Sequence, residues 1–269
     1  MVQNIGKSAF IFVVVAFYFS SCGQGVDEKD LFKQITAQDS GFLQKKEALQ
    51  ILSMADVIDS TNIDHEKYIK ENDTIAKYYK RTDNGNYLFS IKYDVNETYH
   101  SHILIECSSK GKVLKKEIYY HGTEYCFSNY YSNFYKLGDF FALKICSNGS
   151  QTYNTDLYLF KEITSQDSLN MIPVDSWIVD DWDIKDIKYV TGSSTMKLEN
   201  DSLTVTYISE TGIFVPVENG NEDEEKFKVI EKKEPLDVIY VYKNQQWHIG
   251  NRENYEKLLN YGFDTNVYF

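Results

Sequence analysis

Two histidines two residues apart, His100 and His102, are the first candidates for chemistry in this chain. On a β-strand they would project to one face, and Glu106 would share that face. An imidazole pair with this spacing can hold zinc or copper when a third ligand approaches. Because Ile103 and Ile105 would lie on the other face, the simpler interpretation is a half-buried strand whose histidines face solvent. We therefore expect no metal and no other cofactor.

A second candidate is the acidic segment around Trp182, which contains Asp180, Asp181 and Asp183. Carboxylates beside an aromatic ring fit a glycoside hydrolase, in which one carboxyl group is the acid and another the nucleophile. The same oxygen-rich segment could bind calcium. A strongly acidic chain is expected to contain such loops by composition alone, so we predict a solvated loop and keep hydrolysis as the alternative.

Motifs for several other chemistries are missing from the sequence. It has no Gly-x-Gly-x-x-Gly or Walker-type loop, no Gly-x-Ser-x-Gly elbow and no His-Glu-x-x-His. Nucleotide cofactors, α/β-hydrolase chemistry and thermolysin-like zinc chemistry therefore have no support.

The N-terminus has the pattern of an export signal. Lys7 lies in a short polar stretch before the apolar run 9–19, which has the length of a signal-peptide core and is too short to span a bilayer. Ser20, Ser21 and Cys22 end this run. The pattern resembles the cleavage box of bacterial lipoproteins, in which the cysteine thiol is lipidated and becomes the new N-terminus. This resemblance implies a mature protein that begins at Cys22 and is anchored by acyl chains.

Residues 23–30 are polar and contain glycine, which suits a flexible tether between membrane and domain. Their acidic character is similar to the tethers of surface-exported lipoproteins in some gut Gram-negative bacteria. We expect a location in the cell envelope, on the outer membrane, facing either the periplasm or the surface.

Charge and aromatic content narrow the range of partners. The net charge is −12, and removing residues 1–21 takes away only Lys7, which moves it to −13. Such a chain repels nucleic acid and anionic lipid headgroups, so acyl chains must hold it to the membrane. Its 22 tyrosines and 15% aromatic content favour strands. Aromatic rings also stack on sugars, although cross-strand packing is the simpler reason for them.

The three other cysteines are Cys107, Cys126 and Cys146. Beyond the inner membrane the environment is oxidising, so a close pair should be bridged. A hairpin centred on Gly138 would place Cys126 and Cys146 on one face but diagonally offset, at the limit of disulfide geometry. We expect no disulfide, with Cys126–Cys146 as the first alternative. Cys107 shares the apolar face of its strand and is expected to be a buried free thiol.

Two helices are expected before the strands. Residues 41–58 have the pattern of an amphipathic helix that Ser40 can cap. A second helix is expected over 66–79. The apolar stripe of the first helix is formed by Ala48, Ile51, Leu52, Ala55 and Ile58.

From residue 85 the hydrophobic period changes to two, which is typical of strands. Short turns join five sequential strands into an antiparallel meander between residues 87 and 161. Residues 164–186 contain Pro173 and show no alternation, so they predict a break in this meander. Further strands are expected over 187–190, 195–198, 203–208, 226–230, 238–242 and 247–249.

The sequence therefore predicts a mainly β protein, an antiparallel meander or sandwich-like domain with one or two N-terminal helices. A partial or small β-propeller is the alternative, although about a dozen strands make barely three four-stranded blades. The expected organisation is a signal peptide (1–21), a flexible tether (22–39), a helical N-terminal segment (40–84) and an antiparallel β domain (85–269).

The leading functional hypothesis is a non-catalytic binding or interaction module of the cell envelope, held by acylated Cys22. Its partner would be a glycan or an envelope protein, and not a nucleic acid. The alternative is a glycan-acting hydrolase that uses carboxylates of the 180–183 loop. An aromatic-lined cleft with two carboxylates within ~5–10 Å would favour the hydrolase. A flat aromatic patch without such a pair would favour binding.

Overall fold

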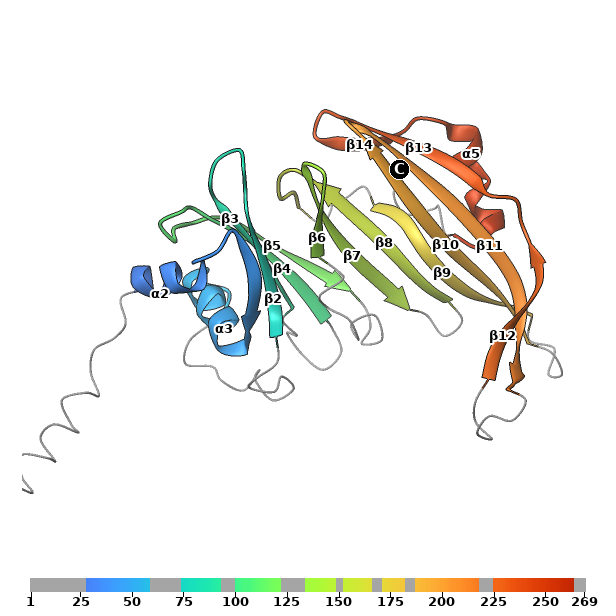
Figure 1. Cartoon of the computed structure of the whole chain (residues 1–269), viewed down its shortest axis with the longest axis horizontal. Helices are drawn as coiled ribbons and strands as arrows, with labels where there is room; N and C mark the ends of the chain where they lie inside the picture. The colour runs from blue at the N-terminus through green and yellow to red at the C-terminus, as the bar shows by residue number, and fades with distance from the viewer. Residues whose placement is uncertain are drawn as a thin grey trace, which may run out of the picture.

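The computed structural model of the chain contains two antiparallel β-sheets that follow one another along the sequence (Figure 1). This confirms the mainly β prediction. In the part of the chain that the structure describes, no helix is both long enough and apolar enough to cross a membrane. The structure describes residues 28–58, 74–92, 100–121, 134–148, 152–165, 171–181, 187–217 and 225–263.

The first sheet has five strands in the order β1-β2-β3-β4-β5. Helices α2 (Glu28–Ile35) and α3 (Lys45–Met54) pack on one of its faces. The predicted stripe of the first helix is buried there, from Ala48 to Ala55, with Ile58 half-buried at its end. The strands are β1 (Ser40–Gln44), β2 (Thr74–Lys80), β3 (Tyr87–Lys92), β4 (His100–Cys107) and β5 (Val113–His121).

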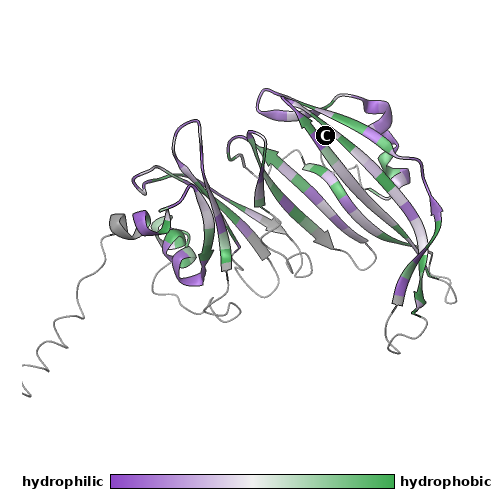
Figure 2. Ribbon diagram, viewed as in Figure 1, coloured by the Kyte–Doolittle hydropathy of each residue, from purple (hydrophilic) through white to green (hydrophobic). Residues whose placement is uncertain are grey.

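The second sheet has nine strands in the order β14-β13-β11-β10-β9-β8-β7-β6, with β12 also paired to β11. Hydrophilic and hydrophobic residues alternate along these strands (Figure 2), as expected when each face has its own environment. The strands are β6 (Phe134–Leu137), β7 (Phe140–Asn148), β8 (Thr152–Phe160), β9 (Met171–Asp181), β10 (Lys188–Glu199), β11 (Ser202–Pro216), β12 (Glu225–Lys232), β13 (Leu236–Lys243) and β14 (Gln246–Ile249).

A shared core joins the two sheets. Leu104 of β4 and Tyr119 of β5 lie in the same buried cluster as Phe141 of β7 and Tyr158 of β8. The rings of Tyr119 and Tyr158 are 5.6 Å apart, and the Tyr119 hydroxyl donates to the Thr164 carbonyl. The first sheet is therefore buried on both faces, by helices on one side and by the second sheet on the other.

A second core lies inside the nine-stranded sheet, which curls until β14 meets β7 and β8. Trp247 of β14 packs 5.0 Å from the Phe140 ring and donates its indole N–H to the Leu159 carbonyl at 2.8 Å. Helix α5 (Arg252–Glu256) and the short helix η4 (Leu258–Tyr261) add Tyr255 and Leu258 to this core.

Several expected boundaries are wrong in the N-terminal region. The tether does not extend to 39, because α2 begins at Glu28 and buries Phe32. The helix predicted over 41–58 begins at Lys45, after strand β1, and its cap is Gln44 in a capping box with Glu47. The second predicted helix is wrong over Thr74–Lys80, which forms β2, and its residues 66–73 lie outside the described residues.

The predicted break in the meander is also misplaced. Met171–Asp181 is a central strand that pairs with both β8 and β10. The chain leaves the first sheet after β5 and enters the second at β6, so the change of sheet comes between residues 121 and 134. Sheets of five and nine strands also rule out the propeller alternative, which requires four-stranded blades.

Candidate binding surface

The predicted His100–His102–Glu106 face does not point to solvent. His102 is fully buried, and Glu106 is 9% exposed, because the second sheet covers this side of β4. His100 belongs to β4, but its side chain is not among those described. Among the described side chains, no three His, Cys, Asp or Glu residues come together in a way that could hold a metal ion.

Glu106 instead takes part in a buried polar network at the edge of the junction between the sheets. Its carboxylate lies 3.5 Å from the Arg81 guanidinium and accepts a hydrogen bond from the Asn86 amide at 2.8 Å. Arg81 is 7% exposed and donates two hydrogen bonds to Asp83. These hydrogen bonds lower the pKa of Asp83 and raise the pKa of Arg81.

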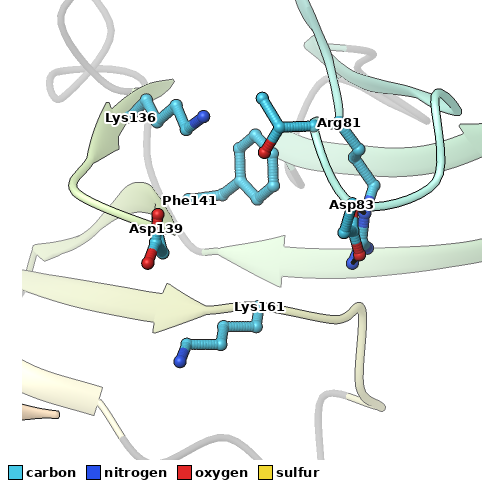
Figure 3. A pocket seen from close by; sticks show the side chains of 7 residues that line it. Arg81, Asp83, Lys136, Asp139, Phe141 and Lys161 are labelled. Atoms are coloured by element: carbon cyan, nitrogen blue, oxygen red, sulfur yellow. Dashed lines mark hydrogen bonds and ion pairs between the residues drawn. The ribbon is translucent and has the colours of Figure 1, made fainter. Parts of the chain in front are cut away.

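A pocket of about 330 Å³ opens beside this network (Figure 3). Lys136 and Asp139 of the β6–β7 hairpin line it on one side, and Arg81 with Asp83 lines it on the other. Lys161 completes the lining, and its amine is 3.0 Å from Asp201. Arg81 and Lys161 are thus engaged by carboxylates of the protein itself. We interpret the pocket as a polar joint between the two sheets.

We expect Arg81→Met to destabilise the fold by about 2 kcal/mol, because it leaves the buried Glu106 carboxylate without its cation. Urea denaturation measures this loss. Adding Glu106→Gln should restore part of the stability, since a neutral amide still accepts from Asn86. A double variant less stable than Arg81→Met alone would contradict this account of the network.

The predicted Asp180–Asp183 site falls largely outside the described side chains. Asp180 and Asp181 end strand β9, but their side chains are not described. Asp183, like Trp182, lies outside the described residues. In the strand pairing, Asp181 is opposite Lys188 of β10. Asp180 and Asp181 therefore lie at the end of β9 in the β9–β10 hairpin.

Next to this hairpin, aromatic side chains from five neighbouring strands share one face of the second sheet. We call them the aromatic row. The rings of Trp177 and Tyr189 stack at 5.0 Å with an interplanar angle of 23°. Phe214 lies 5.0 Å from the ring of Tyr189 and is 40% exposed. The row consists of Tyr153 (β8), Trp177 (β9), Tyr189 (β10), Phe214 (β11) and Phe227 (β12).

Strand register places these residues on one face. Tyr153 is directly opposite Trp177, and Phe214 is directly opposite Phe227. Tyr189 is opposite Gly212, where a Cβ would come within 2.6 Å of the Phe227 ring. Gly212 thus gives the Phe227 ring its space. The row crosses five strands and so extends for about 20 Å.

The row faces away from the second core. On the other side of β9 and β10, Ser176 and Gly192 abut the buried Phe263. Because successive residues alternate between faces, Trp177 and Tyr189 point outward. Both side chains are half-buried, so part of each is exposed to solvent.

Polar residues lie beside the Trp177 end of the row. Asp175 precedes Trp177 by two residues on β9, and its carboxylate is 3.9 Å from the Lys144 amine. Burial raises the pKa of Asp175. The Tyr153 hydroxyl accepts a hydrogen bond from Thr155 at 3.1 Å. The aromatic row thus adjoins hydrogen-bonding groups of both charges.

Neither of the two described cysteines has the features of an activated nucleophile. The Cys146 thiol is 3% exposed and lies 3.7 Å from the Tyr153 hydroxyl, and burial raises its pKa. Burial also raises the pKa of Cys107, to about 12, and this cysteine is a buried free thiol as predicted. Cys126, the predicted partner of Cys146, lies outside the described residues, so the alternative disulfide stays a prediction.

Sequence reasoning missed the aromatic row as a unit. The high tyrosine count and period-two strands indicated that aromatics would pair across strands, but not which ones. Only the register of β8 to β12 brings together residues as distant in sequence as Tyr153 and Phe227.

No protein-family model, curated protein or solved structure matches this chain. The interpretation of the surface therefore depends on its own residues.

Proposed function

We propose that the protein is an outer-membrane lipoprotein whose β domain is a non-catalytic binding module of the cell envelope. The observation that carries the binding role is the aromatic row, an outward-facing series of rings on a stiff sheet. Rings held by register on five paired strands form a preorganised surface, which lowers the entropic cost of binding. The aromatic row is the binding surface in this proposal.

The anchoring part of the proposal depends on the N-terminal pattern. The apolar run 9–19 and the Ser20-Ser21-Cys22 ending support lipidation at Cys22. Helix α2 begins at Glu28, so few residues separate the acylated cysteine from the folded domain. Even fully extended, they reach about 20 Å. The domain would therefore stay close to the membrane surface, where envelope polymers and proteins are its neighbours.

Two observations favour binding over catalysis at the row. The nearby Cys146 thiol has a raised pKa, the opposite of what a nucleophile needs. The described carboxylate beside the row, Asp175, is paired with Lys144. The alternative hydrolase would have to use Asp180, Asp181 or Asp183. Reducing ends released from an incubated polysaccharide, and lost in Asp180→Ala, Asp181→Ala or Asp183→Ala, would favour the hydrolase over the binding module.

We expect Cys22→Ser to move the protein from the membrane fraction to the soluble fraction, because the serine hydroxyl does not replace the lipidated thiol. Fractionation of cells followed by immunoblotting measures this. Ser21→Ala keeps a small residue before the cysteine and serves as the matched control, which should stay membrane-bound. A Cys22→Ser variant as firmly bound as the parent would refute the lipoprotein proposal.

A further inference from the structure

We infer that the tip of the β4–β5 hairpin is a membrane-contact site, where Lys110, Lys112 and Lys115 bind the phosphate groups of anionic lipids. Leu114, which lies among them, reaches the headgroup layer. This inference rests on the proposed anchoring at Cys22 and deepens it. Acyl chains alone leave the domain free to rotate above the bilayer, whereas a second contact fixes which end of the molecule faces the membrane.

The hairpin lies beside the helix that follows the anchor. Gly111, in the turn between β4 and β5, has a left-handed backbone (φ +83°), and a Cβ there would come within 3.0 Å of the Phe32 ring of α2. Phe32 is one helical turn after Glu28, which is about 6 Å along the helix axis. Since at most about 20 Å of extended chain separates Glu28 from Cys22, the hairpin tip is held near the headgroups.

The hairpin presents exposed basic side chains. Lys110 and Lys112 are in the turn and Lys115 is on β5, and all three are exposed. Lys116 differs from them, because its amine donates to two backbone carbonyls at the end of α3. The segment 107–116 contains no acidic residue. Lysines on an edge strand also discourage pairing with another sheet, but that role requires a position on β5, and the two turn lysines are outside it.

Leu114 is turned outward by a β-bulge. It lies between Val113 and Lys115, which pair with successive residues of β4, so it is the extra residue on β5. Its side chain is 50% exposed. An apolar side chain among exposed lysines suits the membrane interface, where amines bind phosphate and the apolar group lies in the headgroup region.

The distribution of charge along the chain favours the same orientation. Residues 28–121, which contain the first sheet, have 14 basic and 15 acidic residues. Residues 122–269 have 13 basic and 24 acidic residues, a net charge of −11. An anionic membrane therefore repels the second sheet and attracts the basic hairpin. Helix α2 lies at one end of the molecule and β12 at the other (Figure 1), so the aromatic row, which ends on β12, is held away from the bilayer.

The test is the fluorescence of the hairpin when the acylated protein is bound to vesicles. A polarity-sensitive fluorophore is attached at Ser109→Cys, an exposed position in the turn, and in a second protein at Gln246→Cys, an exposed position on β14. Both proteins carry Cys126→Ser, which removes a competing thiol, and Cys107 and Cys146 are buried. Vesicles of phosphatidylcholine alone are compared with vesicles that also contain about 30% phosphatidylglycerol.

We expect the emission of the label at residue 109 to shift to the blue on the anionic vesicles and not on phosphatidylcholine. About 0.5 M NaCl should reverse the shift, because salt screens the attraction between lysine and phosphate, while the acyl chains keep the protein bound. The label at residue 246 should not respond to either kind of vesicle.

Combining Lys110→Gln, Lys112→Gln and Lys115→Gln should abolish the shift. Each lysine near an anionic surface contributes about fivefold to binding, so the triple variant should bind anionic vesicles about 100-fold more weakly when both chains carry Cys22→Ser and lack the anchor. Sedimentation with the vesicles measures this affinity. The matched control has the same change in net charge on the second sheet and should bind like the parent. It replaces the exposed Lys226, Lys228 and Lys243 by glutamine.

The outcomes separate this inference from the proposed anchoring. The inference is wrong if the two labels respond alike, if the label at residue 109 shifts equally on phosphatidylcholine, or if the two triple variants lose equal affinity. The anchoring at Cys22 survives each of these results, because mass spectrometry of the N-terminal peptide measures acylation separately. A mature chain without acyl groups would instead refute the anchoring, and this inference with it.

Discussion

Trp247→Ala is expected to lower the free energy of unfolding by about 4 kcal/mol, a large part of the stability of a typical domain. Trp247 is 1% exposed and packs against Phe140 and Tyr242, at 5.0 and 5.2 Å between ring centroids. Its removal opens a cavity and takes away the hydrogen bond to the Leu159 carbonyl. Because β14 is a short edge strand, the Trp247 side chain supplies much of the packing that holds β14 against β7 and β8.

Urea denaturation monitored by circular dichroism measures this loss. Trp247→Phe keeps most of the packing and loses the indole donor, so its cost should be about 1–2 kcal/mol. Phe214→Ala is the control on the outer face, where the ring is 40% exposed, and it should cost less than either. A Trp247→Ala variant within 1 kcal/mol of the parent would mean that β14 does not close over β7 and β8.

The sequence predicted strands best where one face is buried and the other is exposed to solvent. In β11, Leu203, Val205 and Tyr207 are buried and alternate with half-buried polar residues. In β13, buried and exposed residues alternate from Leu236 to Tyr240. Burial of one face produces an alternation of apolar and polar residues with a period of two, so these strands could be predicted from the sequence.

Strand prediction failed where both faces are covered. In β2, Ile75 and Ala76 are buried against the helices, while Tyr79 packs in the shared core between the sheets. With apolar residues on both faces, the alternation disappears and the spacing imitates a helix. For the same reason His102 and Glu106 were predicted to face solvent. No feature of β4 alone reveals that a second sheet covers it.

Pro173 is the reason why β9 was not predicted as a strand. Proline lacks the N–H that a ladder needs, so it argued against a central strand. In the structure, Pro173 is opposite Asp156 at a β-bulge, where the register shifts. Its carbonyl accepts a hydrogen bond from the Tyr207 hydroxyl at 2.8 Å. A bulge is one of the few places where a sheet interior tolerates proline, and it cannot be located from sequence.

The candidate surface was less predictable than the fold, because it depends on register and not on pattern. The segment around Trp182 was a candidate site because acidic residues are adjacent to it in the sequence. Trp177 has its important neighbours, Tyr153 and Tyr189, on other strands. A shift of one residue in either pairing would send these rings to opposite faces. Contacts of this kind follow only from the assembled sheet.

Stability is expected to fall steeply above pH 10, because three buried tyrosines must stay neutral in the folded protein. Tyr119, Tyr207 and Tyr240 are fully buried, and burial raises the pKa of each hydroxyl well above its usual range. The Tyr207 hydroxyl is 3.0 Å from that of Tyr240.

The direction of this pH effect follows from the number of protons that the folded and unfolded states bind. In the unfolded chain these tyrosines ionise near pH 10, whereas in the folded protein they keep their protons. Above that pH the unfolded state holds fewer protons than the folded state, so the free energy of unfolding decreases as the pH rises. The stability that the three neutral tyrosines contribute is complete below pH ~10. By pH 11 its loss lowers the free energy of unfolding by about 4 kcal/mol. Cys107, with a pKa of about 12 against 9.0 when exposed, adds to this loss from pH 9 upward.

Urea midpoints measured at pH 8, 10 and 11 test this expectation. Tyr207→Phe is the informative variant, because it removes one titrating hydroxyl and keeps the ring. Its stability at pH 8 should be lower than that of the parent, since the hydrogen bond to the Pro173 carbonyl is lost. Between pH 8 and 11, however, it should lose about 1.4 kcal/mol less than the parent, one tyrosine's share. An equal loss in both proteins would show that Tyr207 ionises in the folded state and that the core around it admits water.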